Sequence, residues 1–246
     1  MCTVTFIPAG NKFFITSNRD EKAWRSKALA PAVYAQNNFK LLYPKDADKG
    51  GTWIALNENG NAAVLLNGAF VKHEPDARFT KSRGIIFLEI IKSEEPVNEF
   101  ASIDLSATEP FTLILFVNKN LHECRWDGNK KYQSVKDKFQ THIWSSATLY
   151  SHEIVQRREA WFNEWLLQHT RPTADGILHF HLFGGDGDRH NDIRMNRDGH
   201  VFTVSVTGME ISDDEATMRY LDMQDESMHT HSISFIKNSE TVTAGL

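Results

Sequence analysis

The sequence predicts an α+β chain in which sheets and helices pack in layers. Three observations support this: strand patterns occupy both ends of the chain, helical patterns lie between them, and hairpin turn signals separate several short apolar runs. The chain has 246 residues, 41% of them hydrophobic and 24% charged, which is enough to build a sizeable core without disulfides. No repeat, low-complexity tract or linker interrupts it, so we expect one domain spanning residues 1–246.

The N-terminus is expected to open with a hairpin. Residues 2–7 alternate and are rich in β-branched side chains, residues 8–11 read as a turn, and residues 13–16 read as the return strand. The first strand therefore starts at Cys2 and runs antiparallel to the second. The return strand leads directly into Asn18-Arg19-Asp20-Glu21, which a hairpin brings back beside Cys2.

The following elements are predicted in chain order from periodicity and turn chemistry. An Asn-Gly turn joins strands 52–56 and 62–67 into a second hairpin. Residues 111–117 form a nearly continuous apolar run typical of a strand buried on both faces. Strand 121–126 pairs with it. Helices are expected at 82–92, 96–103, 151–168 and 173–183, with Ser151 as an N-cap, and a strand at 201–206.

Composition excludes some classes of function and favours a compartment. The net charge of −5, without a cluster of Lys and Arg, argues against general nucleic-acid binding. Two cysteines do not make a disulfide scaffold and favour a reducing compartment. The N-terminus lacks the pattern of a secretory signal and no apolar run is long enough to span a bilayer, so a cytoplasmic protein is expected.

Cys2 is the principal candidate for chemistry. Removal of Met1 would leave a thiol and a free α-amine on one residue, and an α-amine has an unperturbed pKa of about 7.7–8.0. Near neutral pH this amine can act as the base toward its own thiol, which supplies nucleophile and base together. The alternative is an inert small residue on a terminal strand.

The polar run after the return strand is the second candidate. An arginine beside Cys2 would favour the thiolate, and a neighbouring acid could hold the terminal amine in place. On a strand, Asn18 and Asp20 share one face while Arg19 and Glu21 share the other. The alternative is a charged strand end before a helical stretch that begins near Lys22.

Asn67 is the third candidate, at the end of the second hairpin and just before Gly68. An amide side chain there could donate a hydrogen bond to a developing oxyanion. The alternative is an ordinary turn asparagine, which is common in such positions.

Other residues with metal-binding or nucleophilic side chains give weaker patterns. The spacing of the histidines and acids between residues 179 and 190 matches no known set of metal ligands, and two of them point apart on a helix, so no metal is expected. Cys124 lies on a predicted strand and is expected to be packing. Two histidines near the C-terminus fit an alternating, exposed strand. The residues concerned in the two histidine-containing groups are His179, His181, Asp186, Asp188, His190, His229 and His231.

Several motifs together resemble a known family. Met1-Cys2-Thr3, followed by Thr16-Ser17-Asn18-Arg19-Asp20-Glu21, resembles the family named for its Asn-Arg-Asp-Glu motif, also called the transport and Golgi organisation protein 2 family. Gly50 to Leu56, with the Asn59-Gly60 turn, matches its second signature. Asn196 to Ser205 looks like its C-terminal strand region.

That family is similar in turn to the N-terminal-nucleophile hydrolases, which implies a four-layer αββα sandwich. The resemblance implies Cys2 as nucleophile, Arg19 and Asp20 as its supports, and Asn67 in the oxyanion hole, with Asn18 and Glu21 binding substrate. In those hydrolases the Arg and Asp are separated by two residues whereas here they are adjacent, so Glu21 is an alternative holder of the amine.

The same resemblance predicts one feature that this chain lacks. The hydrolases carry a further asparagine that touches the amine of the nucleophile, and it should fall within residues 144–147. This chain has Ser145 and Ser146 there.

Two functions of different classes follow from these residues. One is an amidohydrolase that acts through Cys2 on a small acyl amide, expected to be linear, or on a related metabolite. The other is a non-catalytic carrier or trafficking protein for a small molecule, haem or lipid-related, on the same scaffold. We expect a small-molecule partner in either case, and no cofactor required for folding, with haem as a ligand only under the second function.

Overall fold

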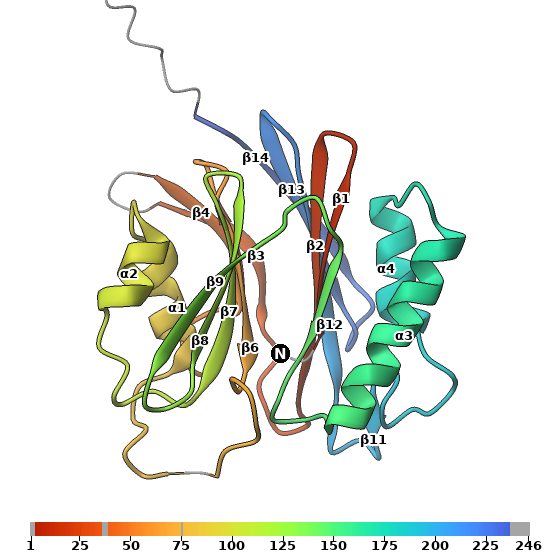
Figure 1. Ribbon diagram of the computed structural model, residues 1–246, viewed down its shortest axis with the longest axis horizontal. Coiled ribbons are helices and arrows are strands. Elements are labelled where there is room, and N and C mark those ends of the chain that lie inside the picture. Colours follow the sequence, from red (N-terminus) through yellow and green to blue (C-terminus); the bar gives the residue numbers. More distant parts are fainter. Residues whose placement is uncertain (1–2, 36–38, 75, 237–246) are drawn as a thin grey trace, which may run out of the picture.

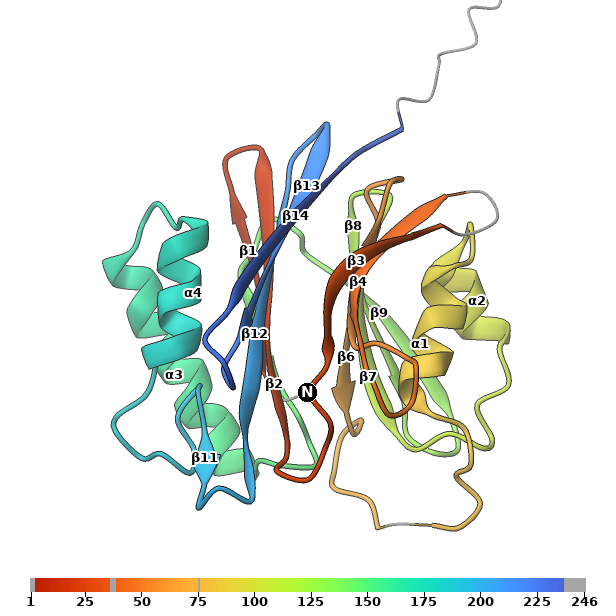
Figure 2. The same cartoon turned by 180° about the vertical axis from the view of Figure 1, so that it is seen from behind.

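The computed structural model describes residues 3–35, 39–74 and 76–236. In this part of the chain two seven-stranded antiparallel sheets lie face to face, and a pair of helices covers the outer face of each. The result is an α+β fold with four layers in the order α, β, β, α, as Figures 1 and 2 show from opposite sides. The predicted fold class is confirmed.

The first sheet, sheet A, carries the N-terminal hairpin. Its strands, in spatial order, are β10 (His142–Ser145), β1 (Thr3–Ala9), β2 (Lys12–Lys22), β12 (Val201–Ile211), β13 (Glu215–Asp222) and β14 (Met228–Ser234), with β11 (Asn196–Arg197) paired to β12. Helices α3 (His152–Gln168) and α4 (Ala174–Phe183) cover its outer face.

The second sheet, sheet B, runs through consecutive strands of the chain. These are β3 (Leu29–Ala35), β4 (Lys40–Lys45), β5 (Ile54–Asn57), β6 (Ala62–Asn67), β7 (Phe111–Val117), β8 (Asn120–Trp126) and β9 (Lys131–Lys136). Helices α1 (Arg83–Ile91) and α2 (Pro96–Ser102) lie against its outer face. None of the helices in the described ranges is long and apolar enough to cross a membrane.

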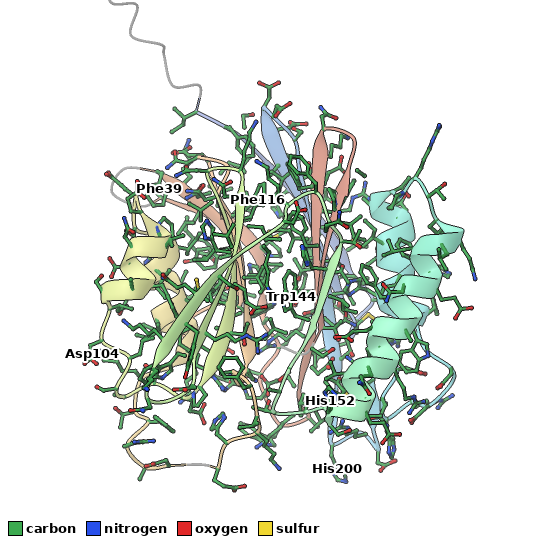
Figure 3. The ribbon with its side chains drawn as sticks, in the orientation of Figure 1. Phe39, Asp104, Phe116, Trp144, His152 and His200 are labelled. Carbon is green, nitrogen blue, oxygen red and sulfur yellow. The ribbon has the colours of Figure 1, made fainter. Side chains whose placement is uncertain are left out.

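Successive side chains of β1 point to opposite faces of sheet A, which separates the core between the sheets from the layer of α3 and α4. Val4 and Phe6 point into the apolar core between the sheets, where Figure 3 labels Phe116 and Trp144. Thr3 and Thr5 point the other way, toward α3 and α4. A smaller apolar cluster on that side packs the helices onto the sheet and contains Ile7, Phe14, Phe162, Ile177, Phe180 and Ile193.

The predicted elements are present, but β2 continues to Lys22 instead of ending at residue 16, and β12 continues to Ile211 instead of ending at residue 206. One expectation is wrong. The N-terminal hairpin pairs Thr3 with Asn18 around a turn in which Gly10 has φ +64°. Ser151 caps α3 by accepting a hydrogen bond from the Ile154 backbone N–H. No helix begins near Lys22, because β2 continues through that residue, where it pairs with Val201 of β12.

Candidate functional site

Cys2 lies outside the described residues, and the site is therefore built from Thr3 onward. Thr3 is fully buried and pairs with Asn18 of β2 on one side and with Ser145 of β10 on the other. The beginning of β1 thus lies between the two segments that sequence reasoning associated with the nucleophile: the polar run of β2 and the serines after β10.

A cleft with a volume of about 530 Å³ opens beside these strands. Both sheets and the start of α1 contribute to its walls, and Arg19, Glu21 and Asn67 are among its lining residues. Three of the six candidate site residues are therefore brought together. The remaining lining residues are Lys22, Trp24, Arg25, Asp46, Lys49, Gly51, Thr52, Trp53, Leu65, Phe79, Thr80, Lys81, Ser82, Arg83, Gly84 and Glu109.

Arg19 is held rigidly on the wall of this cleft. Its side chain is only 5% exposed, and its guanidinium stacks on the Trp53 ring with its central carbon 4.3 Å from the ring centroid. One of its nitrogens donates to Asp46 at 3.0 Å, and Glu21 lies 3.6 Å away. A planar cation with fixed orientation therefore faces the cleft from sheet A.

Asp46 organises the charges around Arg19, and the sequence analysis missed it. Its Oδ2 accepts from Arg19 and from Arg25, while its Oδ1 accepts the backbone N–H groups of Asp48 at 3.0 Å and Lys49 at 2.8 Å. This is the turn geometry typical of an aspartate followed by a glycine with positive φ, here Gly50 at +73°. The sequence signal that could have identified Asp46 is the turn-forming run from Asp46 to Gly50.

Asp20 lies on the opposite face of β2 from Arg19. It is 3% exposed, and its carboxylate accepts a hydrogen bond from the Tyr150 hydroxyl at 2.9 Å and another from the Thr203 hydroxyl at 2.6 Å. It therefore faces the helix layer rather than the cleft. The predicted division of faces, with Asn18 and Asp20 on one side and Arg19 and Glu21 on the other, is confirmed.

Asn18 forms part of a buried polar cluster outside the cleft. Its amide nitrogen donates to the carbonyl oxygens of His181 and Ile193, both at 3.0 Å, so its side-chain oxygen faces the Nδ1 of His181. Nδ1 must then carry the proton, and Nε2 accepts from the Thr5 hydroxyl at 2.8 Å. The structure therefore places Asn18 between sheet A and α4.

Burial makes the neutral form of His181 strongly favoured. The ring is completely enclosed, and this loss of solvation, with a smaller contribution from the positive charge of Arg158, lowers the pKa of His181 to about 3. Within the described ranges no group of three or more His, Cys, Asp or Glu residues could hold a metal ion.

Asn67 is positioned by the segment that follows β10. Its backbone carbonyl accepts a hydrogen bond from the Ser146 hydroxyl at 2.8 Å, and Ser146 in turn contacts the Thr148 hydroxyl at 2.9 Å. The next residue, Gly68, has φ +80°, and a Cβ there would lie 2.9 Å from the Thr148 methyl carbon. Only glycine fits, so the 146–148 segment and β6 together fix where Asn67 enters the cleft.

Arg158 is a second residue that the sequence analysis missed. It is fully buried on α3, its Nη1 donates to the Thr3 hydroxyl, its Nε donates to the Asn191 carbonyl at 3.0 Å, and its guanidinium lies 3.6 Å from the centroid of the Tyr150 ring. The available signal was its position within the apolar stripe of the helix, one turn before Phe162. This arginine connects the helix layer to the beginning of β1.

Comparison with protein families identifies the family of the chain. The model of the family Transport and Golgi organisation 2 matches residues 1–240. The chain belongs to this family. A comparison with the curated proteins found no match.

Solved structures show what fold this family member has. The N-acylethanolamine-hydrolyzing acid amidase ortholog of Caenorhabditis elegans is similar, with TM-score 0.58, 12% identity, and coverage of 85% of this chain and 92% of that one. A mutant of the conjugated bile acid hydrolase of Clostridium perfringens, in which the cysteine at its own position 2 is alanine, gives TM-score 0.57 and 11% identity, covering 97% of each chain. Another variant of that hydrolase gives TM-score 0.59 and 10% identity, covering 96% and 97%. The chain therefore has the N-terminal-nucleophile hydrolase fold.

Proposed function

We propose that the chain is an amidohydrolase that cleaves a linear amide of a small acyl group, with Cys2 as its N-terminal nucleophile. One observation carries the proposal: the residue after Cys2 begins a buried strand beside a cleft whose walls present a fixed guanidinium, Arg19, and an amide side chain, Asn67. The bile acid hydrolase to which the fold is similar also has a cysteine at position 2.

The proposed reaction proceeds through an acyl-enzyme. The α-amine of Cys2 takes the proton of its own thiol, and the thiolate attacks the carbonyl carbon of the amide. The Asn67 amide donates to the oxyanion that forms. The C–N bond then breaks as the α-ammonium returns the proton to the leaving amine, and a water molecule, activated by the same amine, hydrolyses the thioester.

Arg19 and Asp20 support this chemistry from opposite faces of β2. The positive charge of Arg19 favours the thiolate. We assign the orientation of the terminal amine to Asp20 rather than to Glu21, because Glu21 lies 3.6 Å from Arg19 and 3.9 Å from Arg25, whereas hydroxyl donors fix the carboxylate of Asp20.

The test combines intact mass with turnover. The purified protein should lack Met1, and an acyl electrophile that reacts with thiols should add one acyl group to it but none to Cys2→Ala. Wild type should hydrolyse members of a panel of N-acyl amides, and Cys2→Ala should hydrolyse none. A protein that lacks Met1 yet neither accepts the acyl group nor turns over any amide would refute the proposal.

One observation favours a second candidate, a small-molecule carrier. The 144–147 segment contains no side-chain amide, and its Ser146 hydroxyl is used to hold the Asn67 carbonyl. A carrier should bind its ligand equally well as wild type and as Cys2→Ala and should release it chemically unchanged, which mass spectrometry of the recovered ligand would show.

A further inference from the structure

Residues 80–84 lead into the first turn of α1, and all five line the cleft. They bring two hydroxyl groups, from Thr80 and Ser82, and two cations, from Lys81 and Arg83. Ser82 is the N-cap residue of the helix, but its side chain makes no capping hydrogen bond. The first backbone N–H groups of a helix have no partner within the helix, and they carry the positive end of its dipole.

The residues that line the cleft carry a net positive charge, whereas the whole chain carries a net negative charge. The chain carries a net charge of −5, whereas the cleft is lined by more basic than acidic residues. Asp48, which also pairs with Arg25, lies outside the lining, and counting it still leaves an excess of positive charge. The six basic residues are Arg19, Lys22, Arg25, Lys49, Lys81 and Arg83, and the three acidic ones are Glu21, Asp46 and Glu109.

An indole donor in the same wall has no partner. Trp53 is 4% exposed, and its ring N–H makes no hydrogen bond with any part of the chain that the structure describes. A buried donor without an acceptor is costly, and a ligand acceptor atom that reaches this wall would satisfy it. This observation is independent of the helix terminus, and it indicates one ligand acceptor atom beside Arg19.

The two cations of the 80–84 segment are held differently. Arg83 is ion-paired with Glu109 at 3.0 Å, and burial lowers the pKa of its guanidinium while the Glu109 charge opposes that shift. Lys81 is exposed, and its backbone N–H is fixed to the Ala107 carbonyl at 2.9 Å. One cation is therefore preorganised, while the other can close onto a ligand.

We propose that residues 80–84 form an anion subsite and that the substrate of the cleft carries a carboxylate or a phosphate that binds there. This rests on the amidohydrolase function proposed above: the scissile amide lies at the Arg19 and Asn67 part of the cleft while the anionic group contacts Lys81, Arg83, the Ser82 hydroxyl and the start of α1. Amides that lack a negative charge are poor ligands, because the excess positive charge stays uncompensated.

The experiment measures binding in the absence of turnover. Cys2→Ala protein is titrated calorimetrically with three probes that share one acyl chain: N-octanoylglycine, N-octanoyl-O-phosphoethanolamine and the neutral N-octanoylethanolamine. At least one of the two anions should bind at least about tenfold more tightly than the neutral amide. This difference in affinity should shrink as the salt concentration is raised. The tighter of the two anions identifies a carboxylate or a phosphate as the preferred group.

Variants assign the preference to the subsite. Lys81→Gln and Ser82→Ala, made in the Cys2→Ala background, should each weaken binding of the preferred anion several-fold while leaving the neutral amide within a factor of about two. Lys92→Gln removes an exposed cation from the other end of the same helix and is the matched control; it should change neither affinity.

The results separate this inference from the proposed function. Equal affinity for charged and neutral probes, equal losses for all three in Lys81→Gln, or no binding of any probe would overturn the anion subsite. Selective binding of anions by Cys2→Ala, with no hydrolysis of any probe by the wild type, would keep the subsite and remove the amidohydrolase. If the wild type hydrolyses the neutral amide as fast as the anions, the amidohydrolase function is kept and the anion subsite is overturned.

Discussion

The guanidinium of Arg158 donates a hydrogen bond to the hydroxyl of Thr3, and so connects helix α3 to the first described residue of β1. The same guanidinium holds the carbonyl groups of Asn191 and Asp192 and stacks on Tyr150, whose hydroxyl donates to Asp20. The beginning of β1 and the acid on β2 are therefore positioned by one buried cation. A strand terminus that frayed could not present a nucleophile in a constant orientation.

Loss of this cation should destabilise the fold strongly. Arg158→Met removes charge-assisted hydrogen bonds, including those to two partly buried carbonyls, and leaves the Thr3 hydroxyl without this donor. We expect this to lower the free energy of unfolding by about 3 kcal/mol. The neighbouring Arg157 is ion-paired with Asp186 at the surface, so Arg157→Met should cost less than about 1 kcal/mol. Urea denaturation of the two variants provides the comparison, and equal losses would contradict the role of Arg158.

The buried histidine predicts how stability depends on pH. The pKa of His181 is about 3 in the folded chain and about 6.5 when unfolded, so between these values the unfolded state binds the additional proton. Its contribution to stability is fully present above pH 6.5 and is lost as the pH falls toward 3, by up to about 1.4 kcal/mol per pH unit. His181→Gln should be less stable at pH 7 but should show a shallower decline in acid.

Denaturant midpoints at intervals from pH 7 to pH 4 measure this slope. The matched control is His179→Gln on the same helix, which leaves the buried ring in place and should keep the wild-type slope. If His181→Gln and wild type decline in parallel, the histidine is not buried in its neutral form.

The two cysteines should differ in reactivity. Cys124 is fully buried on β8, and burial raises the pKa of its thiol to about 12, so almost no thiolate is present at pH 8. Iodoacetamide should therefore modify native protein once, at Cys2, while Cys124→Ala should be modified to the same extent and Cys2→Ala not at all. Peptide mass spectrometry locates the label, and modification of Cys124 at the rate of Cys2 would contradict the burial.

The proposed oxyanion donor makes a kinetic prediction. Asn67→Ala should lower kcat by about 10² to 10³ with little change in KM, since the lost hydrogen bond forms only as charge develops. Ser146→Ala removes the hydrogen bond to the Asn67 carbonyl without touching the amide, and it should lower kcat by a smaller factor. A larger effect on KM than on kcat in Asn67→Ala would assign this residue to substrate binding instead.

Much of the fold could be read from local sequence patterns. The N-terminal hairpin, the Asn-Gly hairpin, the apolar strand at β7 and the capped helix α3 each carry a signal within a few residues. Strands such as β3 and β9 escaped prediction because their burial patterns are mixed or exposed, and their positions depend on pairing with distant neighbours.

Part of the site was predictable because some of its residues lie on strands that carry a local sequence signal. Arg19 and Asn67 lie on recognisable strands, so strand alternation and hairpin geometry led to them. Arg158 and Asp46 act through contacts made only once the chain is folded: with Thr3, and with Arg19 and Arg25. The stripe position of Arg158 indicates that it lies on the apolar face of α3. An arginine on such a face can still extend its guanidinium to solvent, so its contact with Thr3 could not be predicted.

The central claim, that the α-amine of Cys2 is the catalytic base, is tested most directly by blocking that amine while leaving the thiol intact. Amide hydrolysis is compared between protein that retains an N-terminal tag and the same protein after proteolytic removal of the tag to expose Cys2. The cleaved protein should be active and the tagged protein as inactive as Cys2→Ala, because the tag converts the base into an amide. Full activity of the tagged protein would contradict the account.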